Sequence, residues 1–126
     1  MNRQELICRL RTLSFPPEDY WVVAGGAMVL YWLRDETRDI DLGCSRALAD
    51  RLEAEGFPVL RSADGSRRFL IEGDIELFEE WLYDRVTDVD GIPVISLRGL
   101  LLMKEALGRD KDLADLALIR ARLENR

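Results

Sequence analysis

The stretch from residue 20 to residue 44 constrains the fold most, because its hydrophobic pattern changes twice within a short segment. The segment YWVVAG (20–25) is β-branched and aromatic, which predicts a buried strand. The segment GAMVLYWLR (26–34) starts after the first of two glycines and predicts a helix. In RDIDLGC (38–44), Ile40 and Leu42 alternate with Asp39 and Asp41, which predicts a half-buried strand. Two strands joined through a short helix predict a sheet with helices packed on it.

The rest of the chain adds helices at both ends and strands in the middle. We expect amphipathic helices at 3–13, 45–56, 97–108 and 110–126, and strands at 57–61, 66–82 and 91–96. The segment 66–82 is either one strand bent at Gly73 or two short strands. The order predicts a single α/β domain over residues 1–126 (α+β in some schemes), with a small mixed sheet and helices packed on it.

Composition excludes several classes of protein. The chain has no histidine, which excludes histidine-based triads and histidine metal sites. Its two cysteines form neither a zinc pattern nor a disulfide framework, so buried free thiols in a cytoplasmic protein are expected. The net charge of −6 argues against a broad nucleic-acid surface. The sequence contains no apolar run of about 20 residues, so no membrane association is expected.

Asp39 and Asp41 are the first candidate functional residues. Residues two apart on a strand lie about 6–7 Å apart on the same face. Two carboxylates in that arrangement can hold Mg²⁺, which prefers oxygen ligands, and such sites serve phosphoryl transfer. The alternative is a solvated strand face without function, which is the more common origin of an Asp-x-Asp pair.

Gly25 and Gly26 are the second candidates. They lie between a predicted strand and a predicted helix. Without a Cβ atom they allow a phosphate to approach the backbone, and a helix start offers free N–H groups. The alternative is a tight turn that needs glycine for its geometry alone.

The combined segment GGAMVLYWLRDETRDIDLG (25–43) resembles the signature of the nucleotidyltransferase superfamily typified by DNA polymerase β. Thr37 and Arg38 are similar to the "R-x-T-x-D-hydrophobic-D" pattern of the small bacterial branches, minimal and AbiEii-like. The resemblance implies a nucleotidyltransferase-like fold. It also implies that Asp39 and Asp41 bind catalytic Mg²⁺ and that Gly25 and Gly26 line the triphosphate.

The resemblance extends to a third carboxylate and to the C-terminal segment. Glu76 matches the third metal ligand and general base of the family, with Glu in place of Asp, and Asp74 is the alternative on the same strand face. The segment SLRGLLLMKEALGRDKDLAD (96–115) resembles a pattern in which Lys104 and Arg109 contact the nucleotide phosphates. Ala27 departs from the family, which often carries Ser or Thr after the glycines. The Ala27 and Glu76 departures weigh against full activity.

The resemblance implies a Mg²⁺-dependent enzyme that moves a nucleoside monophosphate from a nucleoside triphosphate, such as ATP, to a hydroxyl group. The acceptor is undetermined and is RNA, a protein or a small molecule. Because the chain has almost nothing beyond the catalytic core, a homodimer or a partner protein could complete the acceptor site. One alternative is a weak or inactive binding module that acts with a partner protein, for example in a toxin–antitoxin pair. The other is a structural domain whose acidic strand faces align without function.

Overall fold

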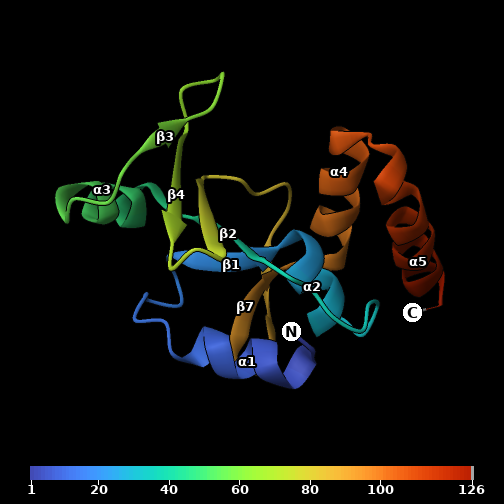
Figure 1. Ribbon diagram of the computed structural model, residues 1–126. Helices are drawn as coiled ribbons and strands as arrows, with labels where there is room; N and C mark the ends of the chain where they lie inside the picture. Colours follow the sequence, from blue (N-terminus) through green and yellow to red (C-terminus); the bar gives the residue numbers. More distant parts are fainter. Residues whose placement is uncertain (126) are drawn as a thin grey trace.

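The computed structural model describes residues 1–125 of the chain. It has the mixed α/β architecture that the sequence predicts, with helices at both ends of the chain and most strands between them (Figure 1). The helices are α1 (Arg3–Arg11), α2 (Ala24–Leu30), α3 (Arg46–Ala54), α4 (Leu97–Leu107) and α5 (Leu113–Glu124), with a 3₁₀ turn, η1 (Asp110–Asp112), before α5. The strands are β1 (Tyr20–Val23), β2 (Ile40–Cys44), β3 (Leu60–Arg61), β4 (Arg67–Ile71), β5 (Ile75–Glu79), β6 (Val86–Val89) and β7 (Ile92–Ile95).

The seven strands form one mixed sheet in the order β3-β4-β5-β2-β1-β7-β6. Two neighbouring pairs are parallel, β2 with β5 and β1 with β7, and the other pairs are antiparallel. The central strands β1 and β7 are buried along their whole length, as expected for apolar runs without alternation. The sheet therefore brings β2 and β5 side by side, although about 30 residues separate them in the sequence.

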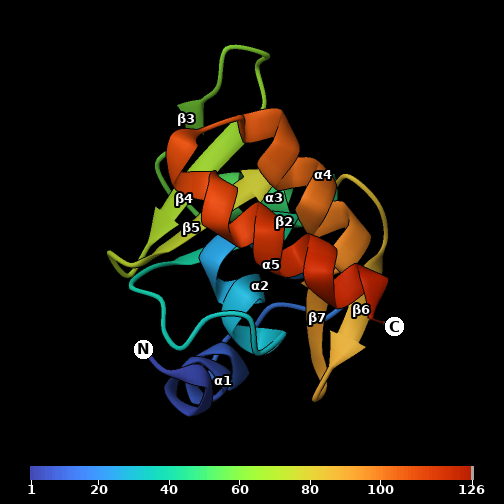
Figure 2. The ribbon, with the colours of Figure 1, turned by 90° about the vertical axis from the view of Figure 1, so that its right-hand side faces the viewer.

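The two faces of the sheet differ in chemistry. On one face, Ile40 and Leu42 of β2, Ile75 and Leu77 of β5 and Phe69 of β4 are fully buried in the core, which also includes residues of α1 and α3. The other face carries Asp41 and Glu76. In Figures 1 and 2, α4 and α5 stand together at one side of the sheet, and α2 lies between them and α1.

Local capping signals account for the helix boundaries near the site. The Asn2 side chain caps α1, with Glu5 completing a capping box. The hydroxyls of Ser45 and Ser96 accept backbone N–H groups at the starts of α3 and α4. Gly108 ends α4 in the left-handed conformation, at φ 58°. The predicted stops at Gly108 and at the end of α3 are confirmed.

Helix α2 differs from the sequence prediction of a helix over 26–34. It begins at Ala24 and ends at Leu30, because Trp32 adopts φ 63°. The Leu33 N–H donates to the Met28 carbonyl and the Trp32 N–H to the Val29 carbonyl, which is a Schellman motif with tryptophan where glycine is usual. The apolar pattern continues to Leu33, so nothing in it signals this end.

Other boundaries also shifted. The segment 66–82 forms two strands, β4 and β5, joined by a turn in which Glu72 and Gly73 have positive φ. Strand β6 was not predicted. The predicted helix 110–126 is η1 followed by α5, and its last residue, Arg126, lies outside the described residues. Within residues 1–125, no helix is long and apolar enough to cross a membrane.

Candidate active site

Asp41 and Glu76 face each other across two parallel strands. The register pairs Asp41 of β2 with Glu76 of β5, so both side chains project from the same face of the sheet. Adjacent strands are about 4.8 Å apart, which brings the two carboxylates within reach of a common ion. Asp39 lies just before β2, on the same parity as Asp41. The two strands thus bring Asp41 and Glu76 together from segments far apart in the chain, and Asp39 lies two residues before Asp41.

The electrostatics of Asp41 reflect this crowding. The pKa of Asp41 is raised to about 6, mainly by burial and also by the nearby negative charges of Glu76 and Asp39. Lys104 and Arg109 act in the opposite direction and only partly compensate. The ionised form of Asp41 is therefore destabilised by its surroundings, a condition that a bound cation would relieve.

A hollow of about 280 Å³ opens beside Asp39 and Asp41. We call it the cationic hollow, because cations from three parts of the chain line it. These residues are Arg34, Arg38, Lys104, Arg109 and Lys111. Its remaining lining comes from the α2 corner, Thr37 and the aspartates that pair with these cations. Its charge pattern suits a polyanion that carries a divalent cation.

Most of these cations are held in place by two buried aspartates. Lys104 is only 3% exposed, and its Nζ lies 3.2 Å from Asp112 and 3.0 Å from Asp115. Arg109 donates two hydrogen bonds to Asp112, at 2.7 and 3.0 Å, and Arg34 pairs with Asp115. Hydrogen bonds from Arg109 and Lys104 lower the pKa of Asp112 to about 2. Asp112 and Asp115 therefore fix the positions of three cations at the wall of the hollow.

Two other cations of the hollow remain available. Within residues 1–125, neither Arg38 nor Lys111 makes an ion pair. Lys104, which the family resemblance assigns to the phosphates, is instead enclosed by carboxylates. Arg109 is about half exposed and lines the hollow while it pairs with Asp112. Direct contact with an anion thus falls most readily to Arg38, Lys111 and the exposed edge of Arg109.

The corner at the start of α2 combines strain with close packing. Ala24 lines the hollow at φ 55°, a left-handed conformation that is costly for alanine. A Cβ atom on Gly25 would lie 2.8 Å from Thr37 Oγ1 and 2.9 Å from Arg34 Nη1, so glycine lets these side chains approach the corner. Gly26 instead faces Val22 and Leu6 in the core. Only Gly25 of the glycine pair lines the hollow.

The two candidates for the third carboxylate have different partners. Asp74 lies 2.6 Å from Arg9 of α1, which also pairs with Glu72 at 2.9 Å. Glu76 has one looser partner, Arg68 of β4, at 3.6 Å. The structure therefore places Glu76 opposite Asp41 and ties Asp74 to α1. Ala27 is fully buried in the core and does not border the hollow.

These carboxylates do not form a closed metal centre by themselves. Among the described residues, no three His, Cys, Asp or Glu side chains converge closely enough to hold an ion alone. Mg²⁺ seldom requires such a cage, because it usually binds one or two carboxylates together with water and substrate phosphates. An oxygen-only pair next to a cationic hollow fits that mode of binding.

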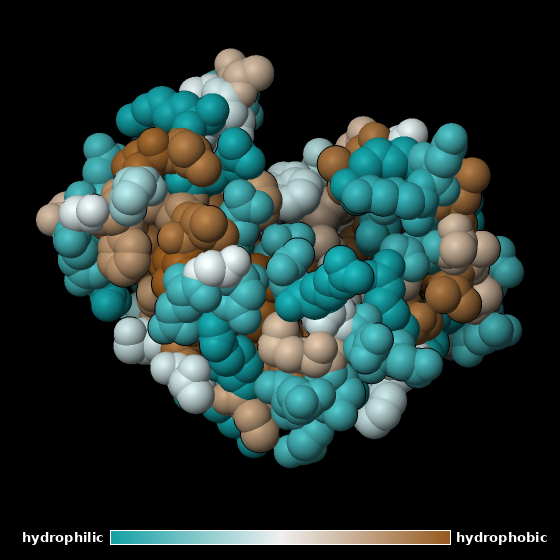
Figure 3. All heavy atoms as spheres, in the orientation of Figure 1, coloured by the Kyte–Doolittle hydropathy of each residue, from teal (hydrophilic) through white to brown (hydrophobic). Residues whose placement is uncertain are grey.

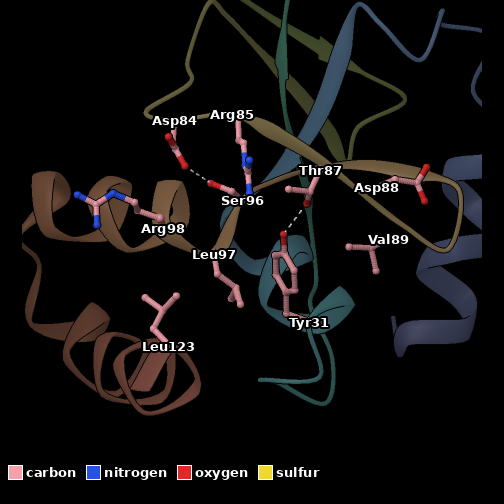
Figure 4. Close-up of a pocket in the computed structure, with 10 residues that line it drawn as sticks. All are labelled: Tyr31, Asp84, Arg85, Thr87, Asp88, Val89, Ser96, Leu97, Arg98 and Leu123. Carbon is pink, nitrogen blue, oxygen red and sulfur yellow. Dashed lines mark hydrogen bonds between the residues drawn. The ribbon is translucent and has the colours of Figure 1, made fainter. Parts of the chain in front are cut away.

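A larger hollow, of about 590 Å³, lies elsewhere, between the start of α4, the β6–β7 hairpin and Tyr31 (Figure 4). Several of its polar groups bind one another. Ser96 donates to Asp84 at 2.7 Å, and the Tyr31 hydroxyl lies 2.9 Å from Thr87 Oγ1 and donates to the Ile95 carbonyl at 2.7 Å. It lacks a facing pair of carboxylates, so we do not place the active site there.

One residue of the candidate site, Arg34, escaped the sequence analysis. Lys111 and Asp115 matched the family's C-terminal pattern, but the pattern assigned them no contact. A signal did exist, because the loop from Arg34 to Arg38 places two arginines between the glycine corner and the acidic strand. The pairing of Arg34 with Asp115, by contrast, spans 81 residues and leaves no local trace.

Comparison with known proteins supports the fold. No protein-family model matches the sequence, and no curated protein matches it. Among solved structures, the chain is similar to the crystal structure of a "putative nucleotidyltransferase" from Thermotoga maritima. The match has a TM-score of 0.54 at 20% sequence identity and covers 98% of this chain and 91% of the other. The chain thus has a nucleotidyltransferase-like fold.

Proposed function

We propose that the chain is a Mg²⁺-dependent nucleotidyltransferase that moves a nucleoside monophosphate from a nucleoside triphosphate to a hydroxyl group of an acceptor. The observation that carries this proposal is the pairing of Asp41, which lines the cationic hollow, with Glu76 on the neighbouring strand. The structural likeness to a protein described as a nucleotidyltransferase supports the same reaction class.

The residues present fit a magnesium site. Asp39, Asp41 and Glu76 offer only oxygen ligands, and burial together with the neighbouring carboxylates makes the ionised form of Asp41 unfavourable without a bound cation. Asp74 is the weaker candidate, because Arg9 holds it. When bound, Mg²⁺ would neutralise charge on the reacting phosphate.

The side chains around the hollow then have distinct roles. Arg38, Lys111 and Arg109 would hold the leaving pyrophosphate, next to Gly25 at the α2 corner. Lys104 would act as a positioning residue, because it fixes the aspartates that hold Arg34 and Arg109. Glu76 would accept the proton of the acceptor hydroxyl while the oxygen of that hydroxyl forms a bond to the α-phosphorus. The bond from that phosphorus to the β-bridging oxygen breaks, and pyrophosphate leaves with the electron pair.

A labelling experiment tests this proposal. The protein is incubated with Mg²⁺ and a cell extract, and with each nucleoside triphosphate labelled in parallel at the α- or the γ-phosphate. We expect transfer of the α-label only, and at least a hundredfold less with the Asp39→Asn/Asp41→Asn variant, because the charge that holds the cation is gone. Glu18→Gln, which removes an exposed carboxylate far from the site, is the matched control. Equal labelling by wild type and the double variant would exclude the enzyme.

One observation favours a second function, that of a nucleotide-binding module without transfer that acts with a partner protein, as in a toxin–antitoxin pair. Arg68 pairs with Glu76, and an arginine beside a carboxylate opposes its use as a base. This module would bind a nucleoside triphosphate with Mg²⁺ but transfer no label. Calorimetric titration alongside the labelling experiment separates the two functions, since binding without transfer supports the module.

A further inference from the structure

A second hollow lies beside the carboxylate pair, and we call it the aromatic hollow. Its volume is about 450 Å³, and Phe78 of β5, Trp81 of the following loop and Leu107 at the end of α4 form its apolar wall. The opposite wall is the β3–β4 hairpin, with Ser62, Asp64 and Ser66. In the space-filling view, the outline of the molecule is notched between this hairpin and α4 (Figure 3).

The aromatic hollow lies near the carboxylate pair, to which β5 and Arg68 connect it. Phe78 follows Glu76 by two residues on β5, so both side chains project from the same face, about 6–7 Å apart. Arg68 connects the two regions, because it lines the aromatic hollow and pairs with Glu76. The cationic hollow lies toward Asp39 and the α2 corner, whereas Phe78 lies in the opposite direction along the strands. The carboxylates therefore separate a site for polyanions from a site for flat apolar groups.

The aromatic wall is held rigidly. The rings of Phe78 and Trp81 are tilted by 56°, with centroids 4.7 Å apart. The Trp21 N–H donates to the Trp81 carbonyl at 2.9 Å, which fixes the loop after β5. Gly43 makes room for Trp21, since a Cβ atom there would lie 1.9 Å from the indole nitrogen. A ligand ring therefore meets a surface that is already formed.

The rim of the aromatic hollow is rich in hydrogen-bond acceptors. Ser62, Ser66 and the carboxylates of Asp64 and Glu80 line it, and Asp64 already accepts two hydrogen bonds from Ser66. Its cation, Arg68, is engaged with Glu76. Phosphate groups would be repelled here. A neutral ring that carries amino groups would find both a stacking surface and hydrogen-bond acceptors.

We propose that the aromatic hollow binds the nucleobase of the nucleoside triphosphate, and that it prefers purines. This inference rests on the proposed function, which places the triphosphate in the cationic hollow and its α-phosphate at the carboxylates. The base then lies beyond the carboxylates, stacked against Phe78 and Trp81. Purines offer the larger stacking face, and the amino groups of adenine and guanine match the acceptors at the rim.

Calorimetric titrations with Mg²⁺ test the proposal on the wild-type protein. The ligands are ATP, GTP, UTP and inorganic tripolyphosphate. We expect ATP and GTP to bind about tenfold or more tightly than tripolyphosphate, with UTP between them, because base stacking on an aromatic side chain contributes at this level. Equal affinity for ATP and tripolyphosphate would overturn the inference.

Variants locate the effect within the protein. Phe78→Leu and Trp81→Leu should each weaken ATP binding about tenfold and leave tripolyphosphate binding unchanged. Tyr83→Leu removes an exposed aromatic ring from the same loop outside the hollow and should change neither. Circular dichroism confirms folding, and the wild-type ligand series decides the question if a variant does not fold.

The outcomes separate this inference from the proposed function. If ATP binds and its transfer is lost in the Asp39→Asn/Asp41→Asn variant, while both leucine variants bind ATP normally, the nucleobase site is wrong and the enzyme stands. If the leucine variants weaken ATP binding but no label is transferred, the nucleobase site stands and the transfer reaction falls. If neither ATP nor tripolyphosphate binds, both are overturned.

Discussion

Gly43→Ala should destabilise the protein through a single contact. The added Cβ atom would lie 1.9 Å from Nε1 of Trp21, 2.3 Å from Cε2 and 2.8 Å from Cδ1, whereas nonbonded atoms prefer about 3.5–4 Å. The buried indole must therefore move, which costs about 1–3 kcal/mol and endangers its hydrogen bond to the Trp81 carbonyl, about 1 kcal/mol more. Alanine gains back about 0.5–1 kcal/mol over glycine in a strand. The net loss is about 2 kcal/mol, or roughly 6–8 °C in Tm.

A double-mutant cycle measures this contact. Urea unfolding gives the free energy for wild type, Gly43→Ala, Trp21→Leu and the double variant. Because leucine leaves room beside residue 43, Gly43→Ala should stabilise the Trp21→Leu background by about 0.5–1 kcal/mol, which is the gain of alanine over glycine alone. A loss of about 2 kcal/mol in both backgrounds would refute the reasoning, since the cost would then not depend on the indole.

Three further predictions concern ionisable side chains. Hydrogen bonding to Arg67 lowers the pKa of Glu79. The pair therefore stabilises the fold fully above the ordinary Glu pKa of about 4.3, and this stabilisation is lost as the pH falls through the lower pKa of Glu79 in the folded protein. The urea midpoint should thus fall more steeply from pH 5 to pH 3 in wild type than in Arg67→Met. Lys104→Met should lower the free energy of unfolding by about 2–4 kcal/mol in the same assay, because it removes a buried cation from Asp112 and Asp115. An unchanged free energy would show that the arginine partners of these aspartates are enough to compensate their charge. Ellman's reagent at pH 8 should modify the exposed Cys8 at once. Cys44, whose pKa is raised by burial to about 12, should react only after denaturation. Rapid reaction of two thiols per folded chain would contradict the buried position of Cys44.

The sequence predicted the parts of the fold that depend on local pattern. The buried strand at β1 and the alternating strand at β2 were predicted, because burial on two faces and on one face leave different periodicities. Strand β6 was missed, since Thr87 and Asp88 interrupt its apolar residues at the sheet edge. The early end of α2 was missed because Trp32 adopts a left-handed backbone conformation, which is usually occupied by glycine and is therefore usually visible in the sequence.

The candidate site divides in the same way. Alternation along a strand placed Asp39 with Asp41, and Asp74 with Glu76, because each pair shares parity. It could not show which residue of β5 would face β2, since that depends on the register between two distant strands. The aromatic hollow is likewise a product of tertiary structure, for it joins a hairpin, a loop and the end of a helix.

Two arginines explain why Asp74, which precedes β5, and Glu76 within it are not equivalent. Arg9 of α1 lies 2.6 Å from Asp74 and also pairs with Glu72. Releasing Asp74 would therefore break a network that ties α1 to the sheet. Arg68 lies 3.6 Å from Glu76, and both side chains are about one-third exposed, a geometry that contributes at most about 1 kcal/mol. Mg²⁺ with its bound phosphates could displace such a contact at small cost. Glu76 is therefore held less firmly than Asp74, and in the proposed reaction its weak arginine partner would oppose proton acceptance only slightly.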